Sequence, residues 1–164
     1  MLSSFAGSAE FCNEAKQKGF NTLAVDHKQY GKIDIVKDVK DITYEDIKNA
    51  DHLHASFDCK TYTIAACSRH RERNTLMPKT KYAIECDDVN IYVLNLIYQK
   101  IMKDPNFTFT IENPRGNLRK MLFMIAFENN KTIQCKRHTV WYCKYGDERA
   151  KPTDIWTNLK KLDS

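Results

Sequence analysis

The sequence lacks the features that mark membrane proteins, secreted proteins and zinc-binding domains. No apolar run approaches the roughly 18 residues that a membrane-spanning helix needs. The first residues show no basic stretch followed by an apolar one, as a signal peptide would. The six cysteines follow one another at spacings of 47, 8, 19, 49 and 8 residues, without a Cys-x-x-Cys pair or a zinc signature. Scattered thiols are typical of a reducing compartment, so we expect an intracellular protein with no metal site and no membrane partner.

Repeats and low-complexity tracts are absent as well, and the composition is that of an ordinary globular protein. Of the 164 residues, 42% are hydrophobic and 29% are charged. This length predicts a single domain, residues 1–164, that buries a core without disulfides. The net charge of +5 fits a nucleic-acid partner and equally an ordinary margin of solubility. The sequence does not indicate an oligomeric state.

Short β-like runs alternate with helical ones, which is the pattern of an α/β sheet with helical crossovers. The predicted strands are Met1–Phe5, Thr22–Asp26, Ile33–Val36, His52–Ser56, Phe107–Glu112, His138–Cys143 and Asp154–Thr157. The predicted helices are Ser8–Lys18, Thr43–Asn49, Ile84–Met102 and Leu118–Phe127. A capping-box pattern begins the second of these helices, and apolar residues recur every three to four positions in the third. The pattern favours a doubly wound, Rossmann-like sheet.

Residues 60–82 are rich in charged residues and threonine and are predicted to form a mobile loop. Its basic side chains are candidates for phosphate contacts, which position a nucleic acid without specifying its sequence. They are Arg69, Arg71, Arg73, Lys79 and Lys81. A solvated charged surface explains the same residues equally well. In the same segment, Tyr62 is a candidate either for stacking on a base or for packing in the core.

A thiol and a carboxyl group follow two of the predicted strands. Cys59 comes soon after His52–Ser56, and Glu112 ends Phe107–Glu112. An α/β sheet places its chemistry at the carboxyl ends of its strands. A thiolate there can add to carbon 6 of a flipped cytosine and activate carbon 5, while a carboxyl group holds the N3 and N4 edge. Taken alone, Cys59 also suits a structural thiol, and Glu112 a capping or ion-paired carboxylate.

The N-terminal part carries residues that suit a cofactor site. Gly7 lies in a turn between the first predicted strand and the first helix, where the backbone can approach a ligand. It is the only glycine of the G-x-G-x-x-G pattern present, so an ordinary turn is as plausible. Asp26 ends the second strand, where an acid can accept from ribose hydroxyls, and Asp41 could accept from an adenine amine. A capping or solvated role is the alternative for each aspartate.

Several segments resemble blocks of the short, bacteriophage- and virus-type DNA cytosine-5 methyltransferases. The Glu-Asn-Pro-Arg-Gly-Asn-Leu-Arg-Lys run at 112–120 is similar to the Glu-Asn-Pro segment of that group. Residues 139–147 and 151–158 resemble its C-terminal blocks. The Phe-Ala-Gly-Ser run at 5–8 looks like its S-adenosylmethionine loop, and 55–63 looks like its nucleophile loop. The blocks occur in the expected order along nearly the whole chain.

The resemblance implies a Rossmann-like methyltransferase fold, S-adenosylmethionine as the cofactor and DNA as the partner. It makes Cys59 the nucleophile and Glu112 the residue that holds the cytosine, and it matches Arg149 to an arginine that contacts the base. It implies that Asn113 and Pro114 shape the substrate loop. The implied cofactor residues are Phe5, Gly7, Asp26 and Asp41.

The chain also departs from the pattern of this group. Phe57-Asp58 stands before the nucleophile where the group has proline, which loosens the loop, and the acid disfavours a neighbouring thiolate. Ala9 replaces the second glycine of the cofactor loop. The alternative is therefore an inactive relative that binds nucleic acid or serves as a virus structural component. An RNA cytosine methyltransferase is a third hypothesis, and the chain leaves little room for a separate target-recognition domain.

Overall fold

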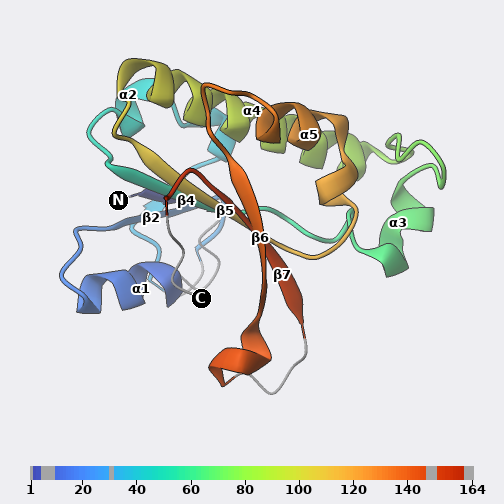
Figure 1. Cartoon of the computed structure of the whole chain (residues 1–164), viewed down its shortest axis with the longest axis horizontal. Coiled ribbons are helices and arrows are strands. Elements are labelled where there is room, and N and C mark those ends of the chain that lie inside the picture. The colour runs from blue at the N-terminus through green and yellow to red at the C-terminus, as the bar shows by residue number, and fades with distance from the viewer. Residues whose placement is uncertain (1, 5–9, 30–31, 147–150, 161–164) are drawn as a thin grey trace.

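The computed structural model describes residues 2–4, 10–29, 32–146 and 151–160 of the chain. Within them, seven strands form one sheet in the order β3-β2-β1-β4-β5-β7-β6 (Figure 1). All strands are parallel except β7, which runs antiparallel to both of its neighbours. The strands are β1 (Leu2–Ser4), β2 (Leu23–Asp26), β3 (Ile35–Val36), β4 (His52–Ser56), β5 (Thr108–Pro114), β6 (Lys136–Trp141) and β7 (Pro152–Thr157).

Helices cover both faces of this sheet. The α-helices are α1 (Glu10–Gln17), α2 (Tyr44–Ile47), α3 (Ile64–His70), α4 (Lys81–Lys103) and α5 (Leu122–Glu128). Figure 1 shows α2, α4 and α5 on one face and α1 on the other. The strand order reverses between β1 and β4, as it does at the switch point of a doubly wound sheet. The predicted α/β architecture is thus confirmed, with an antiparallel β7 between β5 and β6.

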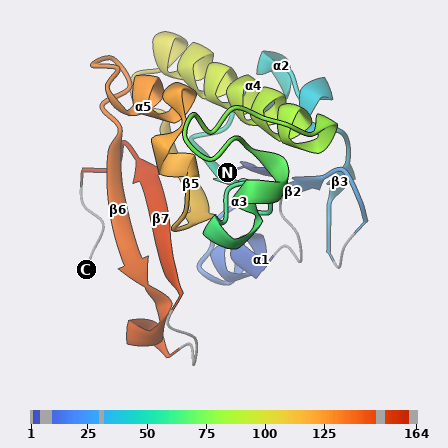
Figure 2. The same ribbon diagram turned by 90° about the vertical axis from the view of Figure 1, so that its right-hand side faces the viewer.

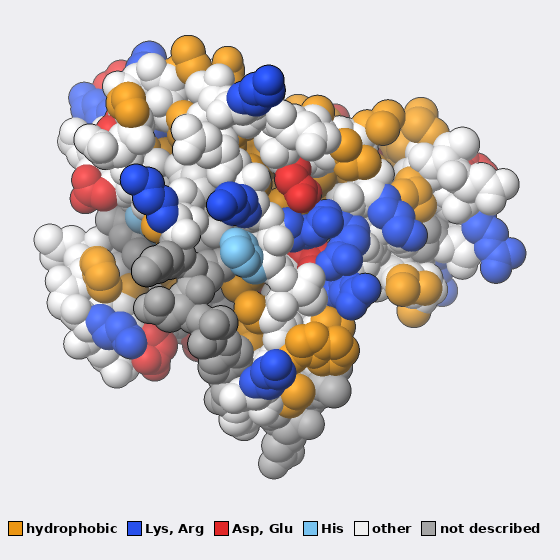
Figure 3. All heavy atoms as spheres, in the orientation of Figure 1, with side chains coloured by type: hydrophobic (Ala, Val, Ile, Leu, Met, Phe, Trp, Pro, Cys, Tyr) orange, Lys and Arg blue, Asp and Glu red, His pale blue; other side chains and the backbone are white. Residues whose placement is uncertain are grey.

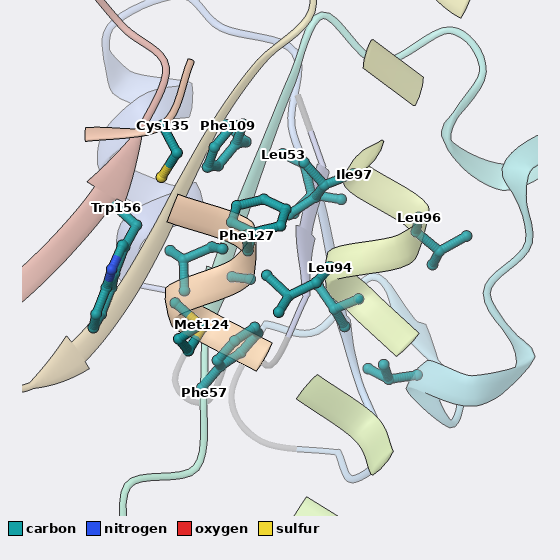
Figure 4. Close-up of a cluster of buried hydrophobic side chains, with 14 of the residues drawn as sticks. Leu53, Phe57, Leu94, Leu96, Ile97, Phe109, Met124, Phe127, Cys135 and Trp156 are labelled. Atoms are coloured by element: carbon teal, nitrogen blue, oxygen red, sulfur yellow. The ribbon is translucent and has the colours of Figure 1, made fainter. Parts of the chain in front are cut away.

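The main core lies between the sheet and α4 with α5. The two central strands alternate, so that Leu53 and Phe109 point into this core while their neighbours in sequence face the other side. Ile97 of α4 and Trp156 of β7 are fully buried in the same cluster (Figure 4). Burial of each such side chain contributes about 1.5–3 kcal/mol. This apolar layer fixes β4 and β5 side by side.

Short-range signals explain where the helices begin. Thr43 and Asp46 form the predicted capping box at the start of α2. The long helix α4 starts at Lys81, three residues before the predicted Ile84, because the Thr80 hydroxyl accepts from the Ala83 amide at 3.2 Å and caps it. The predicted helix 118–127 is interrupted by Met121, whose backbone is extended between a 3-10 turn and α5.

The prediction of a mobile loop over 60–82 is wrong. The segment contains α3 and a turn closed by the bridge between Arg71 and Pro78. Arg71 is fully buried, so it is not a phosphate-contacting residue. Tyr62 is buried too, so of its two predicted roles it packs in the core and is not available to stack on a base. The charge-rich sequence resembled a solvated loop because the partner of Arg71, Asp87, lies on α4, out of reach of any local pattern.

The C-terminal strands differ from the prediction at their ends. The strand β6 runs from Lys136 to Trp141 rather than from His138 to Cys143, because residues 142–145 turn into a 3-10 helix (η3, Tyr142–Tyr145). Gly146 ends that turn with a φ of 95°, a left-handed conformation that favours glycine. The strand β7 begins at Pro152, two residues before the predicted start.

Candidate active site

Glu112 lies in β5 and Cys59 in the loop after β4, and these two neighbouring parallel strands end at the same edge of the sheet. In the β4–β5 register, Ser56 lies opposite Glu112, and the Phe57 amide continues the ladder by donating to the Glu112 carbonyl at 3.2 Å. Cys59 follows two residues later and is partly exposed. Figure 2 views the molecule with α3, the helix after this loop, in front of the sheet. The sheet therefore brings the two predicted reactive groups to one edge.

Cys59 differs from the buried cysteines of the described chain. Cys12, Cys86 and Cys135 are buried. Burial raises the pKa of Cys86 to about 11 and that of Cys135 to about 12, so both are protonated thiols at neutral pH. Cys143 is exposed in η3. Cys59 is thus an accessible cysteine at the carboxyl ends of the strands.

Hydrogen bonds within the loop and to α4 hold the loop that carries Cys59. The Cys59 carbonyl accepts from the amides of Tyr62 and Thr63 at 3.0 and 3.1 Å. The Asp58 carboxylate accepts from the Lys60 amide at 2.8 Å and from the hydroxyl of Tyr82 on α4. Burial and this carboxylate together raise the pKa of Tyr82. Hydrogen bonds at Asp58 therefore replace the stiffness that proline would give this loop.

Glu112 is partly buried on the face of the sheet opposite the main core. Burial raises the pKa of its carboxyl group, against the opposing effects of the Lys151 charge and a hydrogen bond with the Ser56 side chain. The next residue, Asn113, is fully buried and donates from its amide nitrogen to the Phe57 carbonyl at 2.9 Å. Asn113 thereby ties the segment before Cys59 to β5.

The residues after Glu112 continue this connection. Pro114 pairs with Thr153 at the end of the β5–β7 ladder. The Asn117 amide donates to the Tyr62 carbonyl at 2.7 Å. Gly116 lies against the same carbonyl, and a Cβ at this position would stand 2.6 Å from the oxygen. Only a glycine allows this close approach of the two loops.

A buried polar cluster anchors the Cys59 loop to α4. The guanidinium of Arg71 donates to both carboxylate oxygens of Asp87 at 2.9 and 2.7 Å and to the Thr61 carbonyl at 3.0 Å. It lies 4.3 Å from the centre of the Tyr62 ring. The Tyr62 hydroxyl donates to Asp87 at 2.6 Å and accepts from Asn90 at 2.8 Å. No local sequence pattern indicates this cluster, because its members come from separate segments.

A pocket of about 490 Å³ lies beside the loop, at the carboxyl ends of β2 and β4. It is bounded by the end of β2, the 3-10 turn η1 (Val39–Asp41), the loop after β4 and one side of α4. The lining residues are His27, Asp38, Val39, Lys40, Asp58, Tyr82, Glu85, Cys86, Val89 and Asn90. A volume of this order accommodates a nucleoside-sized ligand, and mixed apolar and acidic walls suit its base and hydroxyl groups.

The predicted cofactor residues lie in different places relative to this pocket. Asp26 is buried at the end of β2, next to His27, which lies 2.8 Å from its carboxylate; the Lys28 amide donates to the same oxygen at 3.2 Å. Asp41 is exposed at the end of η1 and does not line the pocket. Asp38, the N-cap residue just before η1, does. The predictions for Phe5, Gly7 and Arg149 lie outside the described residues.

Sequence reasoning missed the contributions of α4 to the pocket. Tyr82 and Cys86 lie one turn apart on its first half and face the Asp58 loop. The start of α4 at Lys81 and its helical period place them on one side, so a correct N-terminal boundary would have indicated them. Among the described residues, no group of three His, Cys, Asp or Glu side chains could hold a metal ion. No described helix is long and apolar enough to cross a membrane.

Comparison with known proteins gives a match in structure but none in sequence. No protein-family model matches the chain, and no curated protein matches it. The Entamoeba histolytica methyltransferase EhMeth superposes with a TM-score of 0.64 at 14% identity, covering 99% of this chain and 54% of that one. The Dnmt2 methyltransferase of S. pombe gives 0.65 at 12% identity, covering 99% and 50%. A DNMT2 variant of Spodoptera frugiperda gives 0.60 at 14%, covering 99% and 53%.

These similarities establish the fold. The chain is a mixed α/β domain that resembles the methyltransferase fold of these structures and spans about half of their length.

Proposed function

We propose that this chain is an S-adenosylmethionine-dependent cytosine-5 methyltransferase domain acting on DNA, with Cys59 as the nucleophile and Glu112 as the residue that holds the base. The observation that carries the proposal is the placement of these two side chains at the ends of β4 and β5, where Ser56 and Glu112 are paired. The methyltransferase fold supports it. We further propose that residues 1–164 act as one domain.

In this proposal each residue has a defined chemical task. Cys59, as the thiolate, adds to carbon 6 of a cytosine turned out of the stack, which makes carbon 5 nucleophilic. Glu112 binds the N3 and N4 edge of the ring. Because burial raises the pKa of Glu112, its protonated form persists to higher pH than that of a solvated glutamate and can donate to N3. Asn113 keeps the Cys59 loop at a fixed place relative to Glu112.

The pocket next to Asp58 fits the proposed cofactor. S-adenosylmethionine supplies a methyl group on a positively charged sulfur when it is bound. Asp38 and Glu85 provide carboxylates for a cationic ligand with hydroxyl and amine groups, and Val39 and Val89 provide apolar contact for a base. Asp26 at the end of β2 is proposed to accept from the ribose, and Asp41 from the adenine amine. Phe5 and Gly7 are proposed to complete the site, and Arg149 to contact the base.

Basic side chains near α3 support a nucleic-acid partner. Arg69, Arg73, Lys79 and Lys81 are exposed, and the Lys79 ammonium also donates to the Ser68 carbonyl at 2.7 Å. Figure 3 shows Lys and Arg side chains on the side of the molecule where α3 lies in Figure 1. Contacts of these residues with phosphates would position the strand, and the reading of bases would remain with the site itself.

Transfer of a tritiated methyl group from S-adenosylmethionine tests the proposal. Duplex DNA, single-stranded DNA and tRNA are compared as acceptors, so that the RNA hypothesis is decided in the same experiment. Cys59→Ser is expected to abolish transfer and leave cofactor binding intact. Cys143→Ser, at an exposed cysteine in η3, is the matched control and should retain full transfer. Equal transfer by Cys59→Ser and the parent would refute the assignment of the nucleophile.

A second candidate function is favoured by Asp58. Its carboxylate is bound to Tyr82 and Lys60 beside Cys59 and brings a negative charge to the place where nucleic-acid phosphates would approach. We propose, as the alternative, a methyltransferase-fold protein without activity that binds nucleic acid or serves as a virus structural component. Calorimetric titration with S-adenosylmethionine separates the two: saturable binding supports the enzyme, and its absence together with no methyl transfer supports the alternative.

A further inference from the structure

A row of polar side chains runs along β4 and β5 to Glu112, on the face of the sheet opposite the main core. In the parallel register, His52 lies opposite Thr108, His54 opposite Thr110 and Ser56 opposite Glu112. Because the residues of each pair point to the same side and every second residue shares a face, these six side chains form one continuous ladder. We call this set the histidine ladder.

Hydrogen bonds join the histidine ladder from end to end. His52 Nδ1 lies 2.8 Å from Thr108 Oγ1, and His52 Nε2 lies 3.1 Å from Thr110 Oγ1. The same threonine oxygen lies 2.8 Å from His54 Nδ1, and His54 Nε2 lies 3.3 Å from Ser56 Oγ. Ser56 is the register partner of Glu112, and hydrogen bonding from its side chain lowers the pKa of the Glu112 carboxyl group. Hydrogen bonds thus connect Thr108 to Ser56, and the strand register places Ser56 opposite Glu112.

Each histidine in the ladder is neutral at physiological pH. Burial is the main cause that lowers the pKa of both His52 and His54 to about 4. The ring of Phe11 from α1 stacks on His54, with the ring centres 3.8 Å apart. A neutral imidazole has one N–H donor and one acceptor nitrogen. Every member between the two ends therefore donates one hydrogen bond and accepts one, and the whole ladder has a direction.

In one direction, the chain of donors ends on a backbone carbonyl. Thr108 Oγ1 donates to the Asp51 carbonyl at 3.2 Å, so it accepts from His52, which then carries its proton on Nδ1. The hydroxyl of Thr110 donates to His52 Nε2 and accepts from His54 Nδ1. The Ser56 hydroxyl then donates its one hydrogen to His54 Nε2, so toward Glu112 it can only accept a hydrogen bond. Glu112 must be the donor, and it must be protonated.

In the other direction, every proton of the ladder is reversed. An ionised Glu112 accepts from the Ser56 hydroxyl, so Ser56 accepts from His54, which carries its proton on Nε2. Thr110 donates to His54 Nδ1, and His52 Nε2 donates to Thr110. The Thr108 hydroxyl then donates to His52 Nδ1 and no longer to the Asp51 carbonyl. That carbonyl still accepts from the Thr108 backbone amide at 3.0 Å. Both arrangements are complete, and they differ in the charge of Glu112.

We propose that the histidine ladder couples the protonation of Glu112 to the tautomers of His54 and His52, which makes Ser56 and His54 positioning residues for the Glu112 proton. The proposal rests on the role of Glu112 in the proposed function. The tautomer with hydrogen on Nδ1 accompanies the protonated carboxyl group that donates to the base. The tautomer with hydrogen on Nε2 accompanies the carboxylate.

Each proton that Glu112 gives to the ladder is matched by one proton that leaves the ladder at its other end. When Glu112 gives its proton to Ser56, Ser56 passes its own proton to His54 Nε2, and His54 passes the Nδ1 proton to Thr110. The same exchange moves a proton through His52 to Thr108, and Thr108 releases one proton to water beside the exposed Asp51. Uptake of a proton by Glu112 reverses each transfer. The ladder thus connects the carboxyl group to solvent at the opposite end of the strands.

Other groups around Glu112 act on its charge but do not join the ladder. The positive charge of Lys151 favours the carboxylate. Tyr142 in η3 lies near enough for the Glu112 charge to raise the pKa of its hydroxyl, after burial as the larger cause. Burial, which raises the pKa of Glu112, and the Lys151 charge, which lowers it, act on the pH at which Glu112 titrates. The ladder determines what the histidines do when it titrates.

Nuclear magnetic resonance of the free protein tests this inference. Two-bond correlation spectra of protein with ¹⁵N-labelled histidine distinguish the two neutral tautomers, and the ¹³C shift of the Glu112 carboxyl group follows its charge. The titration runs upward from the pKa of about 4 above which both ladder histidines are neutral, so that it includes the raised pKa of Glu112. We expect His54 to change from the Nδ1–H to the Nε2–H tautomer over the same pH range in which Glu112 loses its proton.

Two variants make the test specific. Ser56→Ala removes the link to Glu112, so Glu112 should still titrate while the pH-dependent change of the His54 tautomer is lost. Ser68→Ala, at an exposed serine of α3 outside the ladder, should behave as the parent. A His54 tautomer that stays constant while Glu112 titrates would overturn the proposal, as would a change that persists in Ser56→Ala.

The experiment is independent of methyl transfer, since it uses neither cofactor nor nucleic acid. A coupled tautomer change in a protein without transferase activity would support the ladder and count against the enzyme. Methyl transfer in a protein whose His54 tautomer is fixed would do the opposite.

Discussion

Gly116 lies against the carbonyl of Tyr62 so closely that a Cβ on it would stand 2.6 Å from the oxygen. This contact joins the segment after Glu112 to the loop that begins with Cys59. The backbone amide of Asn117 also donates a hydrogen bond of 2.7 Å to the same Tyr62 oxygen. The two candidate reactive groups are therefore fixed relative to each other by backbone contacts as well as by the sheet.

Gly116→Ala tests the importance of this contact. The added methyl group must push the Tyr62 carbonyl away, and overpacking of this kind costs about 1–3 kcal/mol of unfolding free energy. Denaturant unfolding measures that loss, and the methyl-transfer assay should show a further decrease in the fully folded variant, because Cys59 moves relative to Glu112. An unchanged stability and rate would show that the loops separate without consequence.

Arg71→Met should destabilise the chain through its buried ion pair. The variant leaves Asp87 without the guanidinium that donates to both of its oxygens. Loss of one partner of a buried pair costs about 3–5 kcal/mol. Arg73→Met, two residues away at an exposed position, is the matched control and should change the unfolding free energy by less than about 0.5 kcal/mol. Equal effects of the two variants in urea unfolding would contradict the buried anchor.

Acid should weaken the fold between about pH 6.5 and pH 4 through the two ladder histidines. His52 and His54 have pKa values lowered from 6.5 to about 4, so the unfolded chain binds more protons than the folded one between these values. Stability is therefore lost as pH falls below about 6.5, with a slope of about 1.4 kcal/mol per pH unit for each histidine, and the loss is complete below about pH 4. His54→Asn should reduce this slope, and Ser68→Ala, at an exposed serine of α3, should leave it unchanged. Unfolding at a series of pH values measures both.

Glu112→Gln should stabilise the protein at high pH. The pKa of Glu112 is raised in the folded chain, so its favourable contribution is present below the unfolded-state value and disappears as pH rises through the folded-state value. Glutamine carries no charge to bury, so the variant should exceed the parent in unfolding free energy above that transition and match it at low pH. A variant that is less stable than the parent at every pH would contradict the burial of a titrating carboxyl group.

The sequence predicted those parts of the fold that depend on local pattern. The alternation of apolar and polar residues in His52–Ser56 and the apolar period of α4 each follow from neighbours within a few positions, and both elements are confirmed. The capping box at Thr43 is another local signal. The order β3-β2-β1-β4-β5 agrees with the doubly wound pattern, whereas the antiparallel β7 between β5 and β6 was not predicted.

The remaining features depend on contacts between distant segments. Arg71 looked like a surface charge because its partner Asp87 lies sixteen positions away on α4. The histidine ladder was invisible for the same reason: His54 and Thr110 are 56 positions apart and meet only when β4 and β5 pair in register. For the candidate site, the placement of Cys59 and Glu112 at one edge could be predicted, whereas their buried supports could not.

In the proposed reaction, Cys59 forms a bond to the target cytosine. The most direct measurement uses DNA in which cytosine carries fluorine at carbon 5, because a fluorine cannot leave as a proton does, and the sulfur–carbon bond to the enzyme then persists. After incubation with S-adenosylmethionine, mass spectrometry of the digested protein should find the modified base on the peptide that contains Cys59. An adduct on Cys143 or on another cysteine, or no adduct at all, would contradict the account.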